Sequence, residues 1–212
     1  MGAALLLLGT LQHVLAGSQM QEPLADAVRT ALSAAVSSDD LHRLALDRTE
    51  LVALRNAWVQ RMQPLLEQRL HRAAVNQWRQ EWSNEALQRE LLETIWYEAT
   101  RARLEPELVL GLIEVESDFR KFAVSSAGAL GLMQVMPFWM RELAQEEPRR
   151  LFHLRTNLRF GCVILRHYLD REEGDLFMAL GRYNGSRGQA PYPNAVLAAR
   201  ARWRPSIASN TP

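Results

Sequence analysis

The stretch LVLGLIEVESDF, residues 108–119, is almost entirely apolar but contains three acidic side chains. Apolar residues recur at three- and four-residue steps, which predicts a helix with one buried face. With a rotation of about 100° per residue, Glu116 falls inside the apolar arc, whereas Glu114 and Asp118 fall on the opposite face. We therefore expect Glu116 to face the core. We expect Glu114 and Asp118 to be surface charges that tolerate replacement by Gln and Asn.

A carboxylate that faces a core is unfavourable unless it is neutral or paired. Desolvation raises the pKa of a carboxyl group, and a carboxyl that keeps its proton near neutral pH can act as a general acid. The alternative is that Glu116 lies at the edge of the apolar arc and bonds a buried backbone group or an arginine. Helical geometry by itself leaves both interpretations open.

The rest of the chain predicts an all-α protein. Between about residues 22 and 104, Leu and Trp recur at helical spacing among Arg, Glu and Gln, and strand-type alternation is nearly absent. A length of 212 residues and an apolar fraction of 48% suit one domain with an accessory segment. A net charge of +1 argues against a nucleic-acid-binding protein. The single cysteine, Cys162, rules out an intramolecular disulfide and indicates a buried structural thiol. We expect no metal ion and no cofactor.

The N-terminal stretch AALLLLGTLQHVLAGS is typical of the apolar region of a secretory signal peptide. Val14 and Ala16 stand at the positions that favour cleavage after Ala16, so residues 1–16 are the expected signal peptide. An uncleaved anchor helix is the alternative, since no Lys or Arg precedes the apolar run. Ser18 stands where lipidation would require a cysteine, so we do not expect a lipoprotein. The expected location is the periplasm or cell envelope.

Further motifs follow Glu116. The stretch SSAGALG is rich in small residues and leads into the apolar turn LMQVMP. It is not a phosphate-binding loop, because no Gly-Lys-Ser/Thr follows. Within the turn, Gln134 is a neutral amide suited to holding a polyhydroxy or acetamido ligand. A simple turn with Gln134 as a cap is the alternative.

The order of these motifs resembles that of the soluble lytic transglycosylase (SLT) family, whose catalytic domain is lysozyme-like. The matching residues are Glu116-Ser117, Gly131-Leu132-Met133-Gln134-Val135-Met136-Pro137, Asn157, Leu158, Gly161, Tyr168, Leu169 and Tyr183-Asn184. The resemblance covers roughly residues 95–200. It implies a lysozyme-like catalytic domain at residues 91–205, preceded by an accessory helical segment at 17–90 and followed by a C-terminal tail at 206–212.

Members of this family cleave the β-1,4 bond between N-acetylmuramic acid and N-acetylglucosamine in peptidoglycan, leaving a 1,6-anhydromuramic acid end. The resemblance implies that Glu116 is the single catalytic acid and base, and that Tyr183 hydrogen-bonds it. The residues that would line the sugar cleft are Ser117, Met133, Gln134, Tyr183 and Asn184. For Trp139 and Tyr192, stacking on sugars and packing in the core are both open.

The chain departs from the family at Arg182-Tyr183-Asn184-Gly185-Ser186, where the usual sequence is Ala-Tyr-Asn-Ala-Gly. Arg182 has two candidate roles, contact with a stem-peptide carboxylate or simple exposure to solvent.

Two other functions stay open alongside the transglycosylase. One is a lysozyme-type hydrolase of the same fold, which would need a second well-placed carboxylate. The other is a non-catalytic peptidoglycan-binding module of the envelope. In each case the expected partner is the peptidoglycan glycan strand. Envelope-assembly proteins are a further option, and the oligomeric state is left open.

Overall fold

The computed structural model describes residues 19–38, 48–72 and 81–204. The expected signal peptide at 1–16 and the tail at 206–212 lie outside the described residues. Within the described ranges the chain is helical, and extended pairing is limited to isolated bridges at Leu130. The predicted all-α class is confirmed.

The described residues form eight α-helices and one short 3-10 helix. They are α1 (Asp26–Ser37), α2 (Arg48–Arg72), α3 (Glu85–Arg101), α4 (Pro106–Glu116), α5 (Pro137–Leu143), η2 (Pro148–Phe152), α6 (Leu154–Arg171), α7 (Leu176–Asn184) and α8 (Pro191–Trp203). In the part of the chain that is described, none of these helices is both long and apolar enough to cross a membrane.

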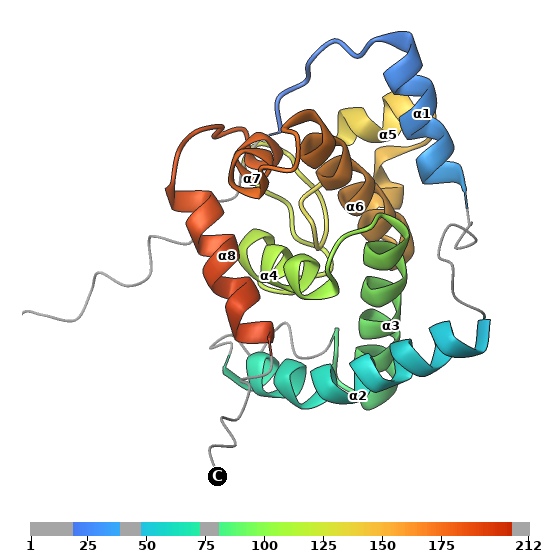
Figure 1. The fold of residues 1–212 in the computed structure, drawn as a ribbon, viewed down its shortest axis with the longest axis vertical. Helices are drawn as coiled ribbons and strands as arrows, with labels where there is room; N and C mark the ends of the chain where they lie inside the picture. The colour runs from blue at the N-terminus through green and yellow to red at the C-terminus, as the bar shows by residue number, and fades with distance from the viewer. Residues whose placement is uncertain (1–18, 39–47, 73–80, 205–212) are drawn as a thin grey trace, which may run out of the picture.

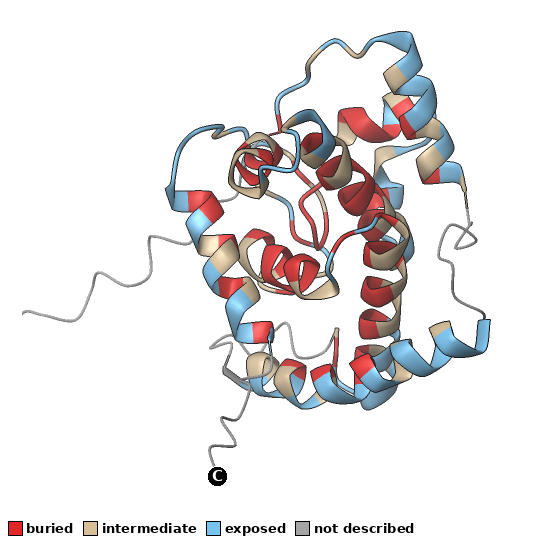
Figure 2. Ribbon diagram, in the orientation of Figure 1, coloured by how far each residue is buried: buried red, intermediate tan, exposed pale blue. Residues whose placement is uncertain are grey.

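Helix α4 is the central element of the fold and packs between α3 and α8 (Figure 1). It is buried along most of its length, from Leu108 to Ile113 and again at Glu116 (Figure 2). A helix that is apolar nearly all round belongs in a core, and the side of this helix that was expected to face solvent, which includes Glu107 and Glu114, is only partly exposed. The helix also ends at Glu116, because Asp118 and Phe119 take left-handed backbone conformations with φ of 51° and 62°.

Gly111 allows α4 and α8 to approach each other closely. A Cβ atom at Gly111 would lie 2.5 Å from the backbone N of Arg200, a distance that no side chain tolerates. The two helices run in opposite directions, because Gly111 meets Arg200 while Glu116 meets Tyr192. The glycine contact therefore positions the start of α8 against the end of α4.

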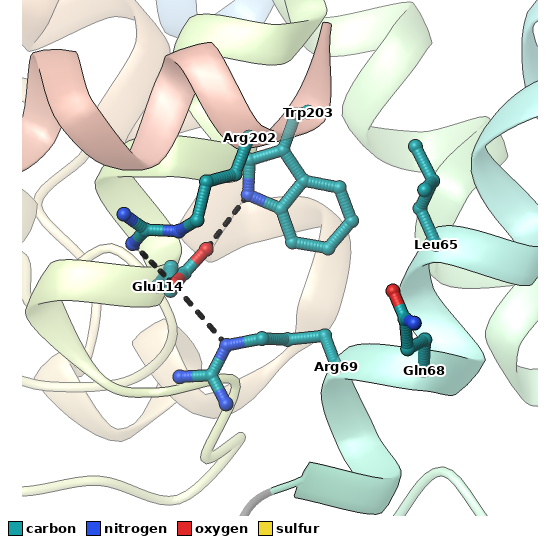
Figure 3. Close-up of a pocket in the computed structure, with 6 residues that line it drawn as sticks. All are labelled: Leu65, Gln68, Arg69, Glu114, Arg202 and Trp203. Carbon is teal, nitrogen blue, oxygen red and sulfur yellow. Dashed lines mark hydrogen bonds and ion pairs between the residues drawn. The ribbon is translucent and has the colours of Figure 1, made fainter. Parts of the chain in front are cut away.

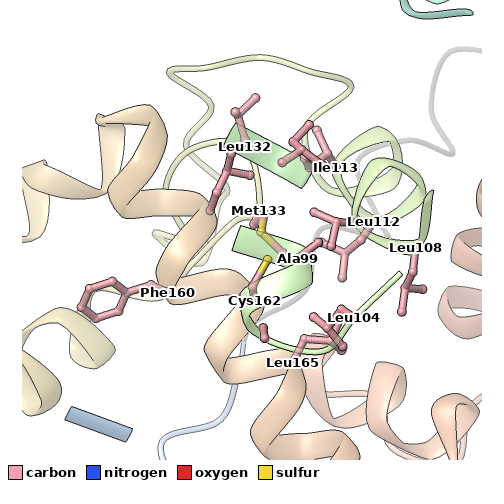
Figure 4. Close-up of a cluster of buried hydrophobic side chains, with 14 of the residues drawn as sticks. Ala99, Leu104, Leu108, Leu112, Ile113, Leu132, Met133, Phe160, Cys162 and Leu165 are labelled. Carbon is pink, nitrogen blue, oxygen red and sulfur yellow. The ribbon is translucent and has the colours of Figure 1, made fainter. Parts of the chain in front are cut away.

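Apolar side chains from α3, α4, α6 and the 123–136 loop form the centre of the core (Figure 4). Leu108 and Leu112 of α4 lie in the same cluster as Cys162 and Leu165 of α6, with Met133 beside them. The prediction that Cys162 is a buried thiol is confirmed.

The accessory helices share this core. Leu32 of α1 and Trp58 and Met62 of α2 belong to the same buried cluster as the central helices. The expected boundary between residues 90 and 91 falls inside α3, and the proposed domain bounds stay a prediction.

A buried carboxylate holds the end of α1 in place. Glu98 of α3 is fully buried and pairs with Arg101 and Arg159 at 2.9 Å and 3.1 Å. The two guanidinium groups also donate to the carbonyls of Ala35 (2.6 Å) and Val36 (3.3 Å). These carbonyls lack partners within the helix because they belong to its last turn. The ion pairs therefore fasten α1 to α3 and α6.

Candidate active site

Glu116 is the last residue of α4 and is only 4% exposed. Its Oε1 atom accepts a hydrogen bond of 2.5 Å from the Tyr192 hydroxyl, whereas its Oε2 atom is buried and has no partner among the described residues. Burial raises the pKa of Glu116 to about 8, and the hydrogen bond from Tyr192 opposes this rise. The prediction that Glu116 faces the buried side is confirmed, and a carboxyl with such a pKa is protonated at neutral pH.

The tyrosine that hydrogen-bonds Glu116 is Tyr192, so the expected hydrogen bond from Tyr183 to Glu116 is wrong, while the expected contact of Tyr183 with the sugar stays a prediction. The Tyr183 hydroxyl instead donates to the carbonyl of Met133 at 2.8 Å. Burial raises the pKa of Tyr183 well above its usual value, and the charge of Glu116 raises it further. This influence indicates that Tyr183 lies near the acid. Tyr192 lies 76 residues from Glu116 in the chain, and no local pattern indicated this contact.

The 123–136 loop is held by the residues of its own motif. Gln134 has a φ of 49°, and its side-chain amide donates to the carbonyls of Gly131 (2.8 Å) and Ala123 (3.3 Å). The amide therefore closes the turn, which agrees with the alternative interpretation of Gln134 as a structural residue.

Asn157 and Gly161 of α6 fix the Met133 part of this loop. The Asn157 side chain accepts from the Met133 N–H at 2.8 Å and donates to the Leu130 carbonyl at 2.9 Å. Gly161 leaves room for the Met133 side chain, since a Cβ atom there would lie 2.4 Å from the Met133 sulfur. These contacts join the Asn157–Gly161 motif of α6 to the Gly131–Pro137 motif of the loop.

The remaining candidates are also buried. The Ser117 hydroxyl donates to the Ile113 carbonyl at 3.2 Å, and Asn184 accepts from the Ser186 hydroxyl at 2.9 Å. Ser117 follows Glu116 in the chain, and the charge of Glu116 acts on the pKa of Tyr183. Tyr183 in turn bonds the carbonyl of Met133, the residue before Gln134. The contact of the five expected cleft residues with a sugar stays a prediction.

Trp139 and Tyr192 pack in the core. Trp139 is buried and contacts the rings of Phe138 and Tyr168, with centroids 5.1 Å and 6.3 Å apart. Tyr192 is buried against Glu116. Of the two interpretations left open, core packing describes both rings in this structure.

Glu114 is not a surface charge, contrary to expectation. The Glu114 side chain is 7% exposed and contacts Arg69 of α2 (3.2 Å), Arg202 of α8 (2.6 Å) and the indole N–H of Trp203 (2.9 Å), as Figure 3 shows. Asp118 lies beyond the end of α4; its side chain is 31% exposed and pairs with the same Arg69. Glu114 therefore connects α4 to α2 and α8.

The chain is similar to known proteins over its C-terminal half. Residues 93–196 match the sequence model of the family described as "Transglycosylase SLT domain". A protein named "Transglycosylase" from Enterobacteria phage PRD1 is 36% identical over 112 residues, which cover 50% of this chain and 41% of the phage protein.

Bacterial relatives carry the name "Membrane-bound lytic murein transglycosylase C". The protein from Actinobacillus pleuropneumoniae serotype 5b is 51% identical over 49 residues, which cover 23% of this chain and 13% of that protein. The protein from Haemophilus influenzae strain PittEE is 30% identical over 115 residues, which cover 47% and 32%. The chain thus spans less than half the length of each of these relatives.

Proposed function

The chain carries a transglycosylase SLT domain at residues 93–196, and from this premise we propose that it is a peptidoglycan lytic transglycosylase. It cleaves the β-1,4 bond between N-acetylmuramic acid and N-acetylglucosamine and leaves a 1,6-anhydromuramic acid end. The observation that carries the proposal is the buried Glu116 carboxyl, which has one oxygen bonded to Tyr192 and the other without a partner among the described residues.

Glu116 acts first as an acid and then as a base. The protonated carboxyl, whose pKa is raised to about 8 by burial, gives its proton to the glycosidic oxygen as the bond to the anomeric carbon breaks. The resulting carboxylate takes the proton of the muramic 6-hydroxyl while that oxygen bonds to the anomeric carbon. The proton of the 6-hydroxyl restores the protonated form of Glu116, and no water is consumed.

A single carboxyl suffices because the substrate supplies its own nucleophile. Most glycosidases use two carboxyl groups, about 5–5.5 Å or about 6.5–9.5 Å apart. Among the described residues, burial and Tyr192 act on the pKa of Glu116, and no carboxylate does. Glu114 and Asp118, the nearest acids in the chain, are paired with arginines. These pairings favour the transglycosylase over a lysozyme-type hydrolase.

Tyr192 is a positioning residue in this scheme. Burial and the neighbouring Glu116 raise its pKa well above the usual value, so the phenol keeps its proton and donates it to Oε1. The hydrogen bond fixes the rotation of the carboxyl group and leaves Oε2 for the sugar.

Digestion of purified peptidoglycan followed by mass spectrometry of the products tests the proposal. We expect muropeptides whose anhydro ends carry one water fewer than lysozyme products. Replacement of Glu116 by Gln is expected to reduce their formation by at least about a hundredfold, because it removes the general acid. The matched control is Glu93→Gln on α3, which removes only a surface ion pair with Arg89. Hydrated ends would contradict the proposal in favour of a hydrolase, and absence of products would favour a binding module.

We propose that the protein acts in the periplasm or cell envelope, because its proposed substrate lies there, and that the expected signal peptide at residues 1–16 directs it there. Cell fractionation tests the location. The mass of the protein recovered from the envelope fraction tells a cleaved signal peptide from an anchor helix, because the two differ by those residues.

A further inference from the structure

The segment before α1 lies against the candidate active site. Figure 1 shows it as the blue stretch that leads from beside α7 to α1. We call residues 19–22 the N-terminal strap. Its first residue, Gln19, is 4% exposed, whereas the next residue, Met20, is 64% exposed. A buried polar side chain at such a position needs partners to offset its desolvation.

The Gln19 amide has two hydrogen-bond partners, both distant in the sequence. Its nitrogen donates to the Gln134 carbonyl at 3.4 Å, and its oxygen accepts from the Met136 N–H at 3.2 Å. The Gln19 side chain also acts to lower the pKa of Tyr183 in α7, although burial raises that pKa overall. The strap therefore occupies polar groups of the 123–136 loop, next to residues that carry the family motifs.

Glu22 fixes the other end of the strap. Its carboxylate pairs with Arg171 of α6 at 2.5 Å and with Arg182 of α7 at 3.4 Å. Arg182 is the residue at which the chain departs from the family pattern, and it also pairs with Glu172. Arg182 is not simply exposed to solvent, because its guanidinium group joins the strap to α7; its contact with a stem-peptide carboxylate stays a prediction.

We propose that the strap is an intramolecular competitor of the glycan. The inference rests on the proposed function and on the family resemblance, which implies that Gln134 and Tyr183 line the glycan cleft. Because Gln19 occupies the Gln134 carbonyl and the Met136 N–H, a glycan has access to these backbone groups only after the strap has moved. Only molecules in which the strap is displaced bind glycan. The apparent affinity for glycan is therefore the intrinsic affinity multiplied by the fraction of such molecules. The strap leaves the chemical step unchanged, because the described contacts of Gln19 do not include Glu116.

Substitutions in the strap of the full chain test this inference. Gln19→Ala removes the amide, and Glu22→Gln removes the charge that faces Arg171 and Arg182. The loss of such contacts weakens the closed strap by about three- to tenfold. We expect KM for soluble glycan strands to fall by up to that factor and kcat to stay constant. Met20→Ala is the matched control, because the Met20 side chain is exposed.

Measurement of glycan affinity separates this inference from the proposed function. Calorimetry in a Glu116→Gln background gives the dissociation constant without turnover, and mass spectrometry of wild-type products reports the reaction. Tighter binding by both strap variants but not by Met20→Ala supports the strap, with or without anhydro products. Anhydro products together with unchanged or weaker binding in folded variants overturn the strap and leave the enzyme. Absence of both binding and products in every variant overturns both.

Discussion

Replacement of Glu116 by Gln should stabilise the protein at alkaline pH. Burial raises the pKa of Glu116 from 4.5 to about 8 in the folded protein. Between these pH values the folded protein holds a proton that the unfolded chain has released. The free energy of unfolding therefore falls as the pH rises through this window, and the contribution is complete only below about pH 4.5. Because Gln cannot ionise, the free energy of unfolding of the variant does not fall for this reason as the pH rises.

The magnitude follows from the width of the window. Each pH unit between the two pKa values lowers the free energy of unfolding by about 1.4 kcal/mol. The whole window therefore corresponds to a loss on the order of 4–5 kcal/mol in the wild type. The Gln side chain has nearly the same shape and keeps an oxygen that accepts from Tyr192. We expect the two proteins to be equally stable near pH 4 and to differ by several kcal/mol near pH 9.

Urea denaturation of both proteins at intervals from pH 4 to pH 9 measures this difference. Other groups titrate alike in the two proteins, so subtraction of the two curves isolates Glu116. A difference that stays constant with pH, or a variant less stable at pH 9, would refute the raised pKa and with it the neutral general acid.

Three further substitutions probe the surroundings of the acid. Tyr192→Phe removes a donor to the ionised form of Glu116, so the alkaline limb of the pH–rate profile should move up by about one pH unit; an unmoved limb would remove Tyr192 from the site. Glu114→Gln removes the negative charge that pairs with two arginines and should lower the free energy of unfolding by about 1–3 kcal/mol in urea. A change below about 0.5 kcal/mol would show that these pairs contribute little. Gly111→Ala places a Cβ atom against the backbone of α8 and should destabilise by about 1–3 kcal/mol or more in the same assay, despite the better helix propensity of Ala; an unchanged midpoint would contradict the close approach.

Much of the architecture could be predicted because it depends on neighbours in the chain. The three- and four-residue spacing of apolar side chains predicted the helices, and helix geometry separated Glu116 from Glu114 and Asp118. The resemblance to the SLT family was confirmed by the match at residues 93–196. Each of these inferences uses either a local period or a motif whose residues stand side by side.

Other features depend on which segments meet, and a periodic pattern carries no such information. The buried side of Glu116 was predictable, but its partner was not, because Tyr192 arrives from 76 residues away. The face of Glu114 was assigned to solvent because nothing local indicates that Arg69 of α2 will cover it.

The sequence by itself determined the helical class, the resemblance to the family and the inward direction of Glu116, since the period of the α-helix dictates the direction of each side chain. Only the tertiary structure decided what surrounds that acid. Desolvation by the packed helices raises the pKa of Glu116 to about 8, and the packing of α8 brings the Tyr192 hydroxyl to it. The same packing seats Gln19 on the 123–136 loop, across 115 residues of chain. Burial is a property of the assembled fold, so the chemistry of this carboxyl arises when the helices come together.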